Sequence, residues 1–156
     1  MKKYDLLVIG GGASGMMAAI SAKNEAPMLS VGLLEGGQRV GKKLLTTGNG
    51  RCNLTNRYLD ISHYYSQDLP SVEAVLARFD LSATEEFFLS LGIPLREGEK
   101  GKMYPFSLQA ASVVDALRFR CEELGVDILT ESKVLSLTEQ GAVCENETYC
   151  AKAVVV

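Results

Sequence analysis

The sequence is poor in the residues that build metal centres and disulfide frameworks. Its only histidine is His63, so neither a His-rich metal cluster nor a pair of Ser-His-Asp sites is a leading hypothesis, and we predict no metal site. Its cysteines form no CxxC pair and show no spacing typical of a disulfide framework. Because no export signal is recognised, we expect reduced thiols in a cytoplasmic protein. The cysteines are Cys52, Cys121, Cys144 and Cys150.

Long apolar runs and an excess of basic charge are also missing. No apolar run approaches the roughly 20 residues of a membrane-spanning helix, so we expect no membrane partner. The apolar stretch after the N-terminal lysines ends at Ile9, which is too short for a secretion signal. A formal net charge of −3 argues against nucleic acid as a partner. With 47% hydrophobic and 22% charged residues, the 156-residue chain is typical of one folded domain.

The first 35 residues contain a strand, a glycine turn, a helix and a second strand, in that order. The apolar run "YDLLVIG" predicts a buried strand and leads into "GGGASG", in which Gly10, Gly12 and Gly15 form a GxGxxG pattern. Good helix formers follow over 14–26, and "SVGLLE" predicts a second buried strand that ends at Glu35. This order predicts a Rossmann-like α/β fold.

Each part of this order has a physical role in binding a dinucleotide. Gly10 permits a tight turn, Gly12 lets the backbone approach a pyrophosphate, and Gly15 lets the helix pack closely on the strand. The N-terminus of the helix offers free N–H groups and a partial positive charge to the phosphates. Glu35 follows Gly15 by 20 residues, the spacing at which an acid binds ribose hydroxyls and disfavours the extra phosphate of NADP. A glycine-rich turn in another βαβ unit would explain the glycines but not Glu35.

A second unusual feature is "GKKLLTTGNGRCNLTN" at 41–56, which combines glycines, asparagines and cations without an acid. A Rossmann domain for NAD would normally proceed here to another helix and strand. We predict instead that the N–H groups of this segment line an extended ligand with anionic or carbonyl groups, such as a flavin. The alternative is a solvated basic loop. The five cations between 36 and 59 are Arg39, Lys42, Lys43, Arg51 and Arg57.

Three stretches together resemble a known family. "GGGASG" with Glu35, the segment at 41–56, and "GKMYPFSLQA" at 101–110 are similar to those of bacterial NAD(P)/FAD-dependent oxidoreductases of the bile-acid-reductase and aminoacetone-oxidase type. These are flavoproteins with two dinucleotide-binding domains, and the resemblance runs from Tyr4 to about Val156. It implies a Rossmann-like FAD/NAD(P)-binding domain with a parallel sheet and an inserted antiparallel β-meander. It also implies FAD as the cofactor and NAD(P)H as a candidate donor.

The resemblance further implies which residues contact FAD. Gly41, Lys42 and Lys43 are expected by the pyrophosphate and ribityl chain, and the stretch 47–53 by the isoalloxazine ring. A strand that begins at Val134 is expected to offer backbone hydrogen bonds to the adenine. With the glycine turn, the expected contacts are Gly10, Gly12, Ala13, Ser14, Gly15, Glu35, Gly36, Gly41, Lys42, Lys43, Thr47, Gly48, Asn49, Gly50, Arg51, Cys52, Asn53 and Val134.

No side chain forms a convincing acid/base pair, so we predict no catalytic residue. Cys52 lies beside Arg51, which would stabilise a thiolate, but no resolving cysteine is close in sequence, and a packed thiol is favoured over a redox thiol. Tyr104 is the acid/base candidate of the charged stretch 96–107. An ordinary packed tyrosine is the favoured interpretation. His63 has no partner pattern and is expected at the surface or in packing.

The remaining elements are predicted from periodicity and turn residues. Ser82 and Glu85 predict a capping box at the start of one helix. The last residues, "AKAVVV", predict a buried strand. The expected elements are helices over 69–80, 82–92 and 109–124, a charged loop over 96–107 that covers the cofactor, a third buried strand over 126–131, and a meander of short strands from 133 to 156.

We expect residues 1–156 to be the N-terminal portion of the FAD-binding domain of a longer flavoprotein, inactive by itself. Family members continue from the last strand into a glycine-rich turn, a substrate domain and a final FAD-binding segment, none of which is in this sequence. The expected partners are FAD, a small-molecule substrate and the remainder of the same protein. Two alternatives stay open: an NAD-binding module without flavin, and an RNA-modifying flavoprotein, for which more basic surface would be expected.

Overall fold

The structure, a computed structural model, describes residues 2–156 and divides the chain into two units. The first unit contains the residues up to Leu44 together with Val114–Val156, and the second unit is Leu45–Val113. Within residues 2–156, no helix has the length and apolar character needed to cross a bilayer.

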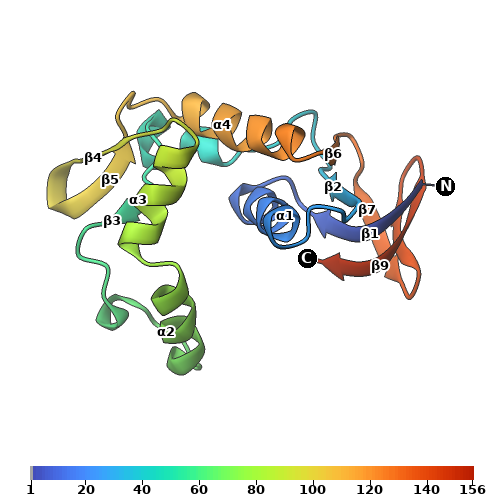
Figure 1. Ribbon diagram of the computed structural model, residues 1–156, viewed down its shortest axis with the longest axis horizontal. Coiled ribbons are helices and arrows are strands. Elements are labelled where there is room, and N and C mark those ends of the chain that lie inside the picture. Colours follow the sequence, from blue (N-terminus) through green and yellow to red (C-terminus); the bar gives the residue numbers. More distant parts are fainter. Residues whose placement is uncertain (1) are drawn as a thin grey trace. The chain divides into compact units, whose positions relative to one another are not determined.

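A six-stranded sheet forms the centre of the first unit (Figure 1). Its strands are β1 Lys2–Ile9, β2 Val31–Leu34, β6 Val126–Leu129, β7 Val134–Thr138, β8 Gly141–Cys144 and β9 Thr148–Val155. Their order in the sheet is β6-β2-β1-β9-β8-β7. The first four run parallel, whereas β9, β8 and β7 pair antiparallel. The predicted parallel sheet with an antiparallel meander is therefore confirmed.

The core of the first unit lies between the sheet and its helices. Helix α1, Ala13–Glu25, packs against β2, which is buried along its whole length. Helix α4, Ala110–Glu123, continues from the second unit into the first, where the Cys121 thiol lies 3.8 Å from the Met16 carbonyl oxygen. Strands buried on both faces have continuous apolar sequences, so these strands could be predicted from their apolar runs.

Tyr4 connects β1 to β6 across β2. Its hydroxyl donates a hydrogen bond of 2.8 Å to the Asp127 carboxylate. Its ring lies over Gly32, where an added Cβ would come within 3.1 Å of two ring atoms. Burial, followed by the hydrogen bond to Asp127, raises the pKa of Tyr4 above its usual value. The phenol therefore remains a protonated donor at neutral pH.

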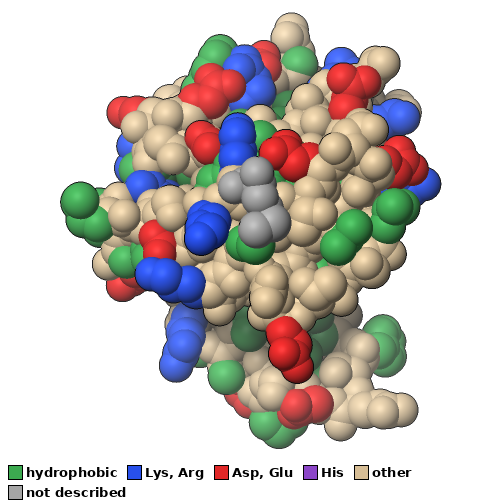
Figure 2. Space-filling view, turned by 90° about the vertical axis from the view of Figure 1, so that its right-hand side faces the viewer, with side chains coloured by type: hydrophobic (Ala, Val, Ile, Leu, Met, Phe, Trp, Pro, Cys, Tyr) green, Lys and Arg blue, Asp and Glu red, His purple; other side chains and the backbone are tan. Residues whose placement is uncertain are grey.

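Charged side chains of both signs are interspersed over the face shown in Figure 2. Within the first unit, Lys152 pairs with Asp5 at 2.7 Å and Lys133 with Glu145 at 3.8 Å. Exposed ion pairs of this kind contribute little to stability. Figure 2 shows no broad area of a single charge on this face.

The second unit contains two helices and a three-stranded antiparallel sheet of order β3-β5-β4. Its strands are β3 Thr55–Asn56, β4 Leu95–Glu97 and β5 Lys102–Pro105, and its helices are α2 Leu69–Arg78 and α3 Leu81–Ser90. Three 3-10 turns, Leu44–Gly50, Ile61–His63 and Glu99–Gly101, complete it. The β4–β5 hairpin corrects the loop predicted over 96–107. Strands this short and this charged leave no alternating pattern to detect.

The predicted capping box on α3 is wrong. Asp80 is the N-cap, and its carboxylate accepts a hydrogen bond of 2.9 Å from the Ala83 N–H. Ser82 lies inside the helix and donates to Glu86 at 3.2 Å. Asp is as good an N-cap as Ser, so the earlier acid takes the position.

Two strands are less buried than predicted. In β6, which lies at an edge of the sheet, Val126 is buried but Asp127 is exposed. In β9, Ala151 and Val154 pack on the core, whereas Val155 is 41% exposed. The apolar runs located both strands correctly but did not reveal that β6 is an edge strand, nor which residues of β9 face the core.

We expect Tyr4→Phe to lower the free energy of unfolding by about 1–2 kcal/mol, because it removes a hydrogen bond to a charged group. Urea unfolding measures the change. Tyr65→Phe is the matched control, since Tyr65 is 98% exposed and its loss should matter by less than about 0.5 kcal/mol. Equal midpoints for the two variants would show that the Tyr4–Asp127 bond does not stabilise the sheet.

Candidate cofactor-binding site

The glycine turn between β1 and α1 brings backbone close to backbone. Gly10 has a φ of +99°, and its carbonyl oxygen lies only 1.8 Å from where a Cβ on Gly15 would stand. A side chain at Gly15 would therefore push α1 away from the turn. This is the close packing that the third glycine of the pattern was predicted to allow.

Gly12 differs, because nothing in the described protein requires a glycine there. Its φ of −78° and ψ of −171° suit any residue, and an added Cβ would meet no atom within 4 Å. A glycine without an internal reason fits a place that a ligand must approach closely. The space beside Gly12 therefore suits the pyrophosphate expected from the sequence.

The N-terminus of α1 begins directly at this space. Gly12 is the N-cap, no side chain caps it, and the first turn contains no acid. Ala13 and Ser14 are exposed there. The first N–H groups of a helix have no partner within the helix and carry a partial positive charge. The turn is thus suited to an anion such as a phosphate.

The Glu35 carboxylate fastens the end of β2 to the glycine turn. One carboxylate oxygen accepts a hydrogen bond of 2.9 Å from the Gly11 N–H, and the other accepts one of 2.7 Å from the Gly37 N–H. A carboxylate has about four lone-pair positions, so two remain for further hydrogen-bond donors. The part played by Gly11 and Gly37 was missed from the sequence, although the run of three glycines at 10–12 was a signal for it.

Other segments join the same place through backbone hydrogen bonds. The Gly41 N–H donates to the Gly11 carbonyl at 2.8 Å. The Ser132 N–H donates to the Glu35 carbonyl at 2.9 Å, two residues before β7 begins at Val134. These bonds gather the predicted contacts Gly10, Gly12, Ala13, Ser14, Gly15, Glu35, Gly36, Gly41 and Val134 around the ends of β1 and β2, with Lys42 and Lys43 exposed just beyond.

This position is the usual ligand site of such a sheet. Along the chain the parallel strands come in the order β1, β2, β6, β9, but across the sheet they lie in the order β6-β2-β1-β9. The chain moves outward from β1 to β2 and β6 and then returns to the other side of β1, so the strand order reverses beside β1. Ligands of open α/β sheets bind at the carboxyl ends of the strands where the order reverses. The carboxyl ends of β1 and β2 lead into Gly10 and Glu35.

The other predicted contacts belong to the second unit. They lie in a tight turn, in which Asn49 has a φ of 59° and Cys52 a φ of 60°. The Arg51 N–H donates to the Gly48 carbonyl at 3.3 Å, and the Cys52 N–H to the Thr47 carbonyl at 3.0 Å. Those two N–H groups are therefore used within the turn itself. The contacts in this unit are Thr47, Gly48, Asn49, Gly50, Arg51, Cys52 and Asn53.

The side chains weighed as reactive groups are mostly structural. Cys52 is 1% exposed, and burial raises the pKa of its thiol, which is the condition of a packed thiol. Tyr104 is 4% exposed, as expected of a packed tyrosine. His63 is exposed at the end of its 3-10 turn.

Residues 4–156 match the family described as the HI0933-like protein Rossmann domain. The chain is 44% identical over 138 residues to a 3-dehydro-bile acid delta(4,6)-reductase of Clostridium scindens, covering 87% of the chain and 34% of the relative. It is 34% identical over 143 residues to a ribosomal RNA dihydrouridine synthase of Escherichia coli, covering 89% of the chain and 34% of the relative. The chain thus spans about a third of the length of these relatives.

Solved structures share the fold at low identity. A quinol fumarate reductase of Escherichia coli superposes with a TM-score of 0.71 at 15% identity, covering 99% of this chain and 32% of the other. At this identity the likeness concerns the fold alone. It agrees with the parallel sheet and its antiparallel addition.

We expect Gly15→Ala and Gly12→Ala to differ sharply in stability. A Cβ at Gly15 meets the Gly10 carbonyl, so the free energy of unfolding should fall by about 3 kcal/mol or more. At Gly12 the lower entropy of the unfolded chain offsets a poorer N-cap, so the change should stay within about 1 kcal/mol. Urea unfolding of both variants measures this, and equal losses would contradict the assignment of Gly12 to a ligand.

Proposed function

Because the chain belongs to the family of HI0933-like Rossmann domains, we propose that it is the FAD-binding N-terminal part of a flavin-dependent oxidoreductase. The observation that carries the proposal is the Glu35 carboxylate, which holds the Gly11 and Gly37 N–H groups and retains lone pairs for a ribose. It stands next to the open space at Gly12 and the uncapped start of α1. These three features suit the ribose and pyrophosphate of one dinucleotide.

Each group of residues has a proposed task. Gly12 and the N-terminus of α1 bind the pyrophosphate, Glu35 binds the adenosine ribose, and the backbone at Val134 contacts the adenine. Lys42 and Lys43 add positive charge near the phosphates and ribityl chain. The turn from Thr47 to Asn53 contacts the isoalloxazine ring through groups other than the Arg51 and Cys52 N–H groups, which the turn itself uses.

When bound, FAD would supply the chemistry of hydride transfer between NAD(P)H or a small organic donor and an acceptor. The protein binds the phosphates, orients the ribose and holds the turn at 47–53 in a fixed shape. We assign no acid or base to this chain. The rest of the protein, beyond these 156 residues, supplies the substrate domain and completes the flavin site.

Reduction of a small organic molecule is the activity we favour. The relative that is 44% identical is named as a reductase of a bile acid, which makes a small-molecule substrate the first candidate. The relative that is 34% identical is named for ribosomal RNA, so modification of RNA is the second candidate. The net charge of −3 favours the first candidate.

We expect the full-length protein to be purified with flavin absorbance bands at about one FAD per chain, because Glu35 and the glycine turn suit the ribose and pyrophosphate of a dinucleotide. An absorbance spectrum, repeated after release of the cofactor by denaturation, identifies the flavin. If neither the full-length protein nor the 156-residue chain takes up FAD after soaking, the chain is an NAD-binding module and the proposal fails.

Glu35→Ala should weaken FAD binding by roughly 10- to 150-fold, because the ribose hydroxyls lose a charged acceptor worth about 1.5–3 kcal/mol. Titration of the cofactor-free protein, followed by flavin fluorescence, gives the dissociation constants. Glu139→Ala is the matched control, since Glu139 is an exposed acid of the same unit. An unchanged affinity in Glu35→Ala would remove the ribose assignment.

A further inference from the structure

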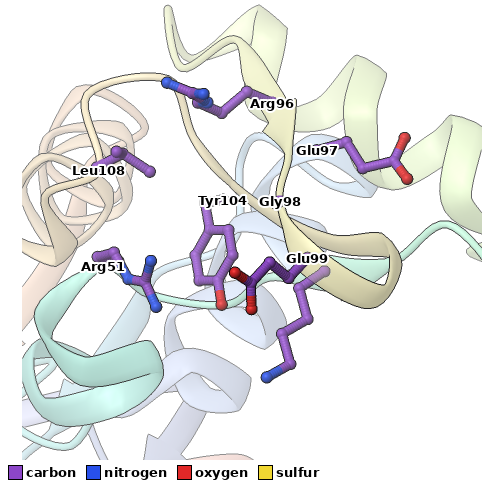
Figure 3. Close-up of a pocket in the computed structure, with 8 residues that line it drawn as sticks. Arg51, Arg96, Glu97, Gly98, Glu99, Tyr104 and Leu108 are labelled. Carbon is purple, nitrogen blue, oxygen red and sulfur yellow. The ribbon is translucent and has the colours of Figure 1, made fainter.

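The second unit contains a cavity of about 300 Å³ that the proposed cofactor contacts do not explain. In Figure 3, Arg51, Arg96, Leu108 and Tyr104 surround the same space, whereas Glu97 points away from it. The cavity is lined by residues of the turn at 47–53, of the β4–β5 hairpin and of the segment that follows β5. Its size is at the lower end of the range for small-molecule sites.

Tyr104 forms the fixed part of this cavity. Its ring fits between two glycines: an added Cβ at Gly48 would lie 3.1 Å from one edge of the ring, and one at Gly98 would lie 2.9 Å from the other. A side chain at either position would displace the ring. No polar side-chain atom within residues 2–156 is both fully buried and without a partner, so the Tyr104 hydroxyl is not left buried and unsatisfied.

Arg51 is held on the face of the same ring. Its guanidinium carbon lies 4.7 Å from the ring centroid, and its Nε donates to the Gly48 carbonyl at 3.1 Å. This stacking and hydrogen bond reduce the rotamer freedom that Arg51 would lose on binding a ligand. The terminal nitrogens of the guanidinium remain as donors, arranged to match an oxyanion.

The charge of the lining is positive. Arg51, Arg96 and Lys102 line the cavity, and within residues 2–156 no carboxylate forms an ion pair with any of them. Glu97 also lines the cavity, but its carboxylate is paired with Arg57 at 2.7 Å and its side chain points away from the cavity in Figure 3. Glu99 is the remaining acid of the lining, and its presence disfavours a ligand of high negative charge such as phosphate.

We propose that this cavity binds the carboxylate of a small organic acid, with the Arg51 guanidinium as the donor, Arg96 as a second cation, and Leu108 with the Tyr104 ring as the apolar wall. The site uses the side chain of Arg51, whose backbone N–H group is taken up by the hydrogen bond to Gly48 within the turn. The inference does not depend on the identity of the cofactor.

Calorimetric titration of the full-length protein with benzoate, benzamide and inorganic phosphate tests the proposal. Benzoate should bind with a dissociation constant of about 1 mM or lower, whereas the neutral and isosteric benzamide should bind at least about tenfold more weakly. Phosphate should not displace benzoate. Equal binding of benzoate and benzamide, no benzoate binding, or stronger binding of phosphate would each overturn the carboxylate assignment.

Variants connect the binding to this cavity. Arg96→Gln should weaken benzoate binding about tenfold or more, and Arg51→Lys should weaken it while keeping the charge, because an ammonium cannot form the planar fork. Arg78→Gln, on the exposed side of α2, is the matched control and should bind benzoate unchanged. Benzoate binding that resists both cavity variants would place the site elsewhere and overturn the proposal.

FAD affinity measured on Arg96→Gln separates this inference from the proposed function. Arg96 has no proposed contact with FAD, so its replacement should reduce benzoate binding and leave FAD binding unchanged. If the native protein binds FAD but not benzoate, the carboxylate site alone is wrong. Charge-dependent benzoate binding in a protein that takes up no FAD would leave this site standing and defeat the flavin assignment.

Discussion

The first unit depends on a single carboxylate that accepts two backbone hydrogen bonds. Glu35 accepts hydrogen bonds from the Gly11 and Gly37 N–H groups. The Gly41 N–H donates to the Gly11 carbonyl, which fastens the segment after β2 to the glycine turn a second time. An amide in place of this acid would offer one acceptor oxygen instead of two, and its NH₂ group would face a donor. The residue that we propose to bind the ribose therefore also holds the glycine turn in shape, and a preorganised turn lowers the cost of binding.

The elements of the fold that are decided locally were predictable from the sequence. The strand, turn, helix and strand before Glu35 each depend on neighbouring residues, and all four are found where they were expected. What remained hidden depends on residues far apart in the chain. The pairing of β9 with β1 and the hairpin of β4 with β5 are set by tertiary contacts, and a three-residue charged strand carries no periodic signal.

The candidate site divides in the same way. The glycines and the acid of the dinucleotide pattern were recognisable because each has one local role: a glycine allows close approach of the backbone, and the acid accepts hydrogen bonds. The use of the Arg51 and Cys52 N–H groups within their own turn was not recognisable, because it follows from the positive φ values that the turn adopts. The cavity at Tyr104 could not be foreseen, because Gly48 and Gly98 make room for its ring from separate segments.

The place of β1 between β2 and β9 has a consequence for how the protein is made. Lys2 pairs with Tyr149, so one edge of β1 stays unpaired during synthesis until β9 has also been made. Contacts between residues so far apart in the chain form slowly, and an apolar strand with an open edge invites association with other chains. The sheet is therefore completed only once β9 is present, and until then β1 keeps an open edge.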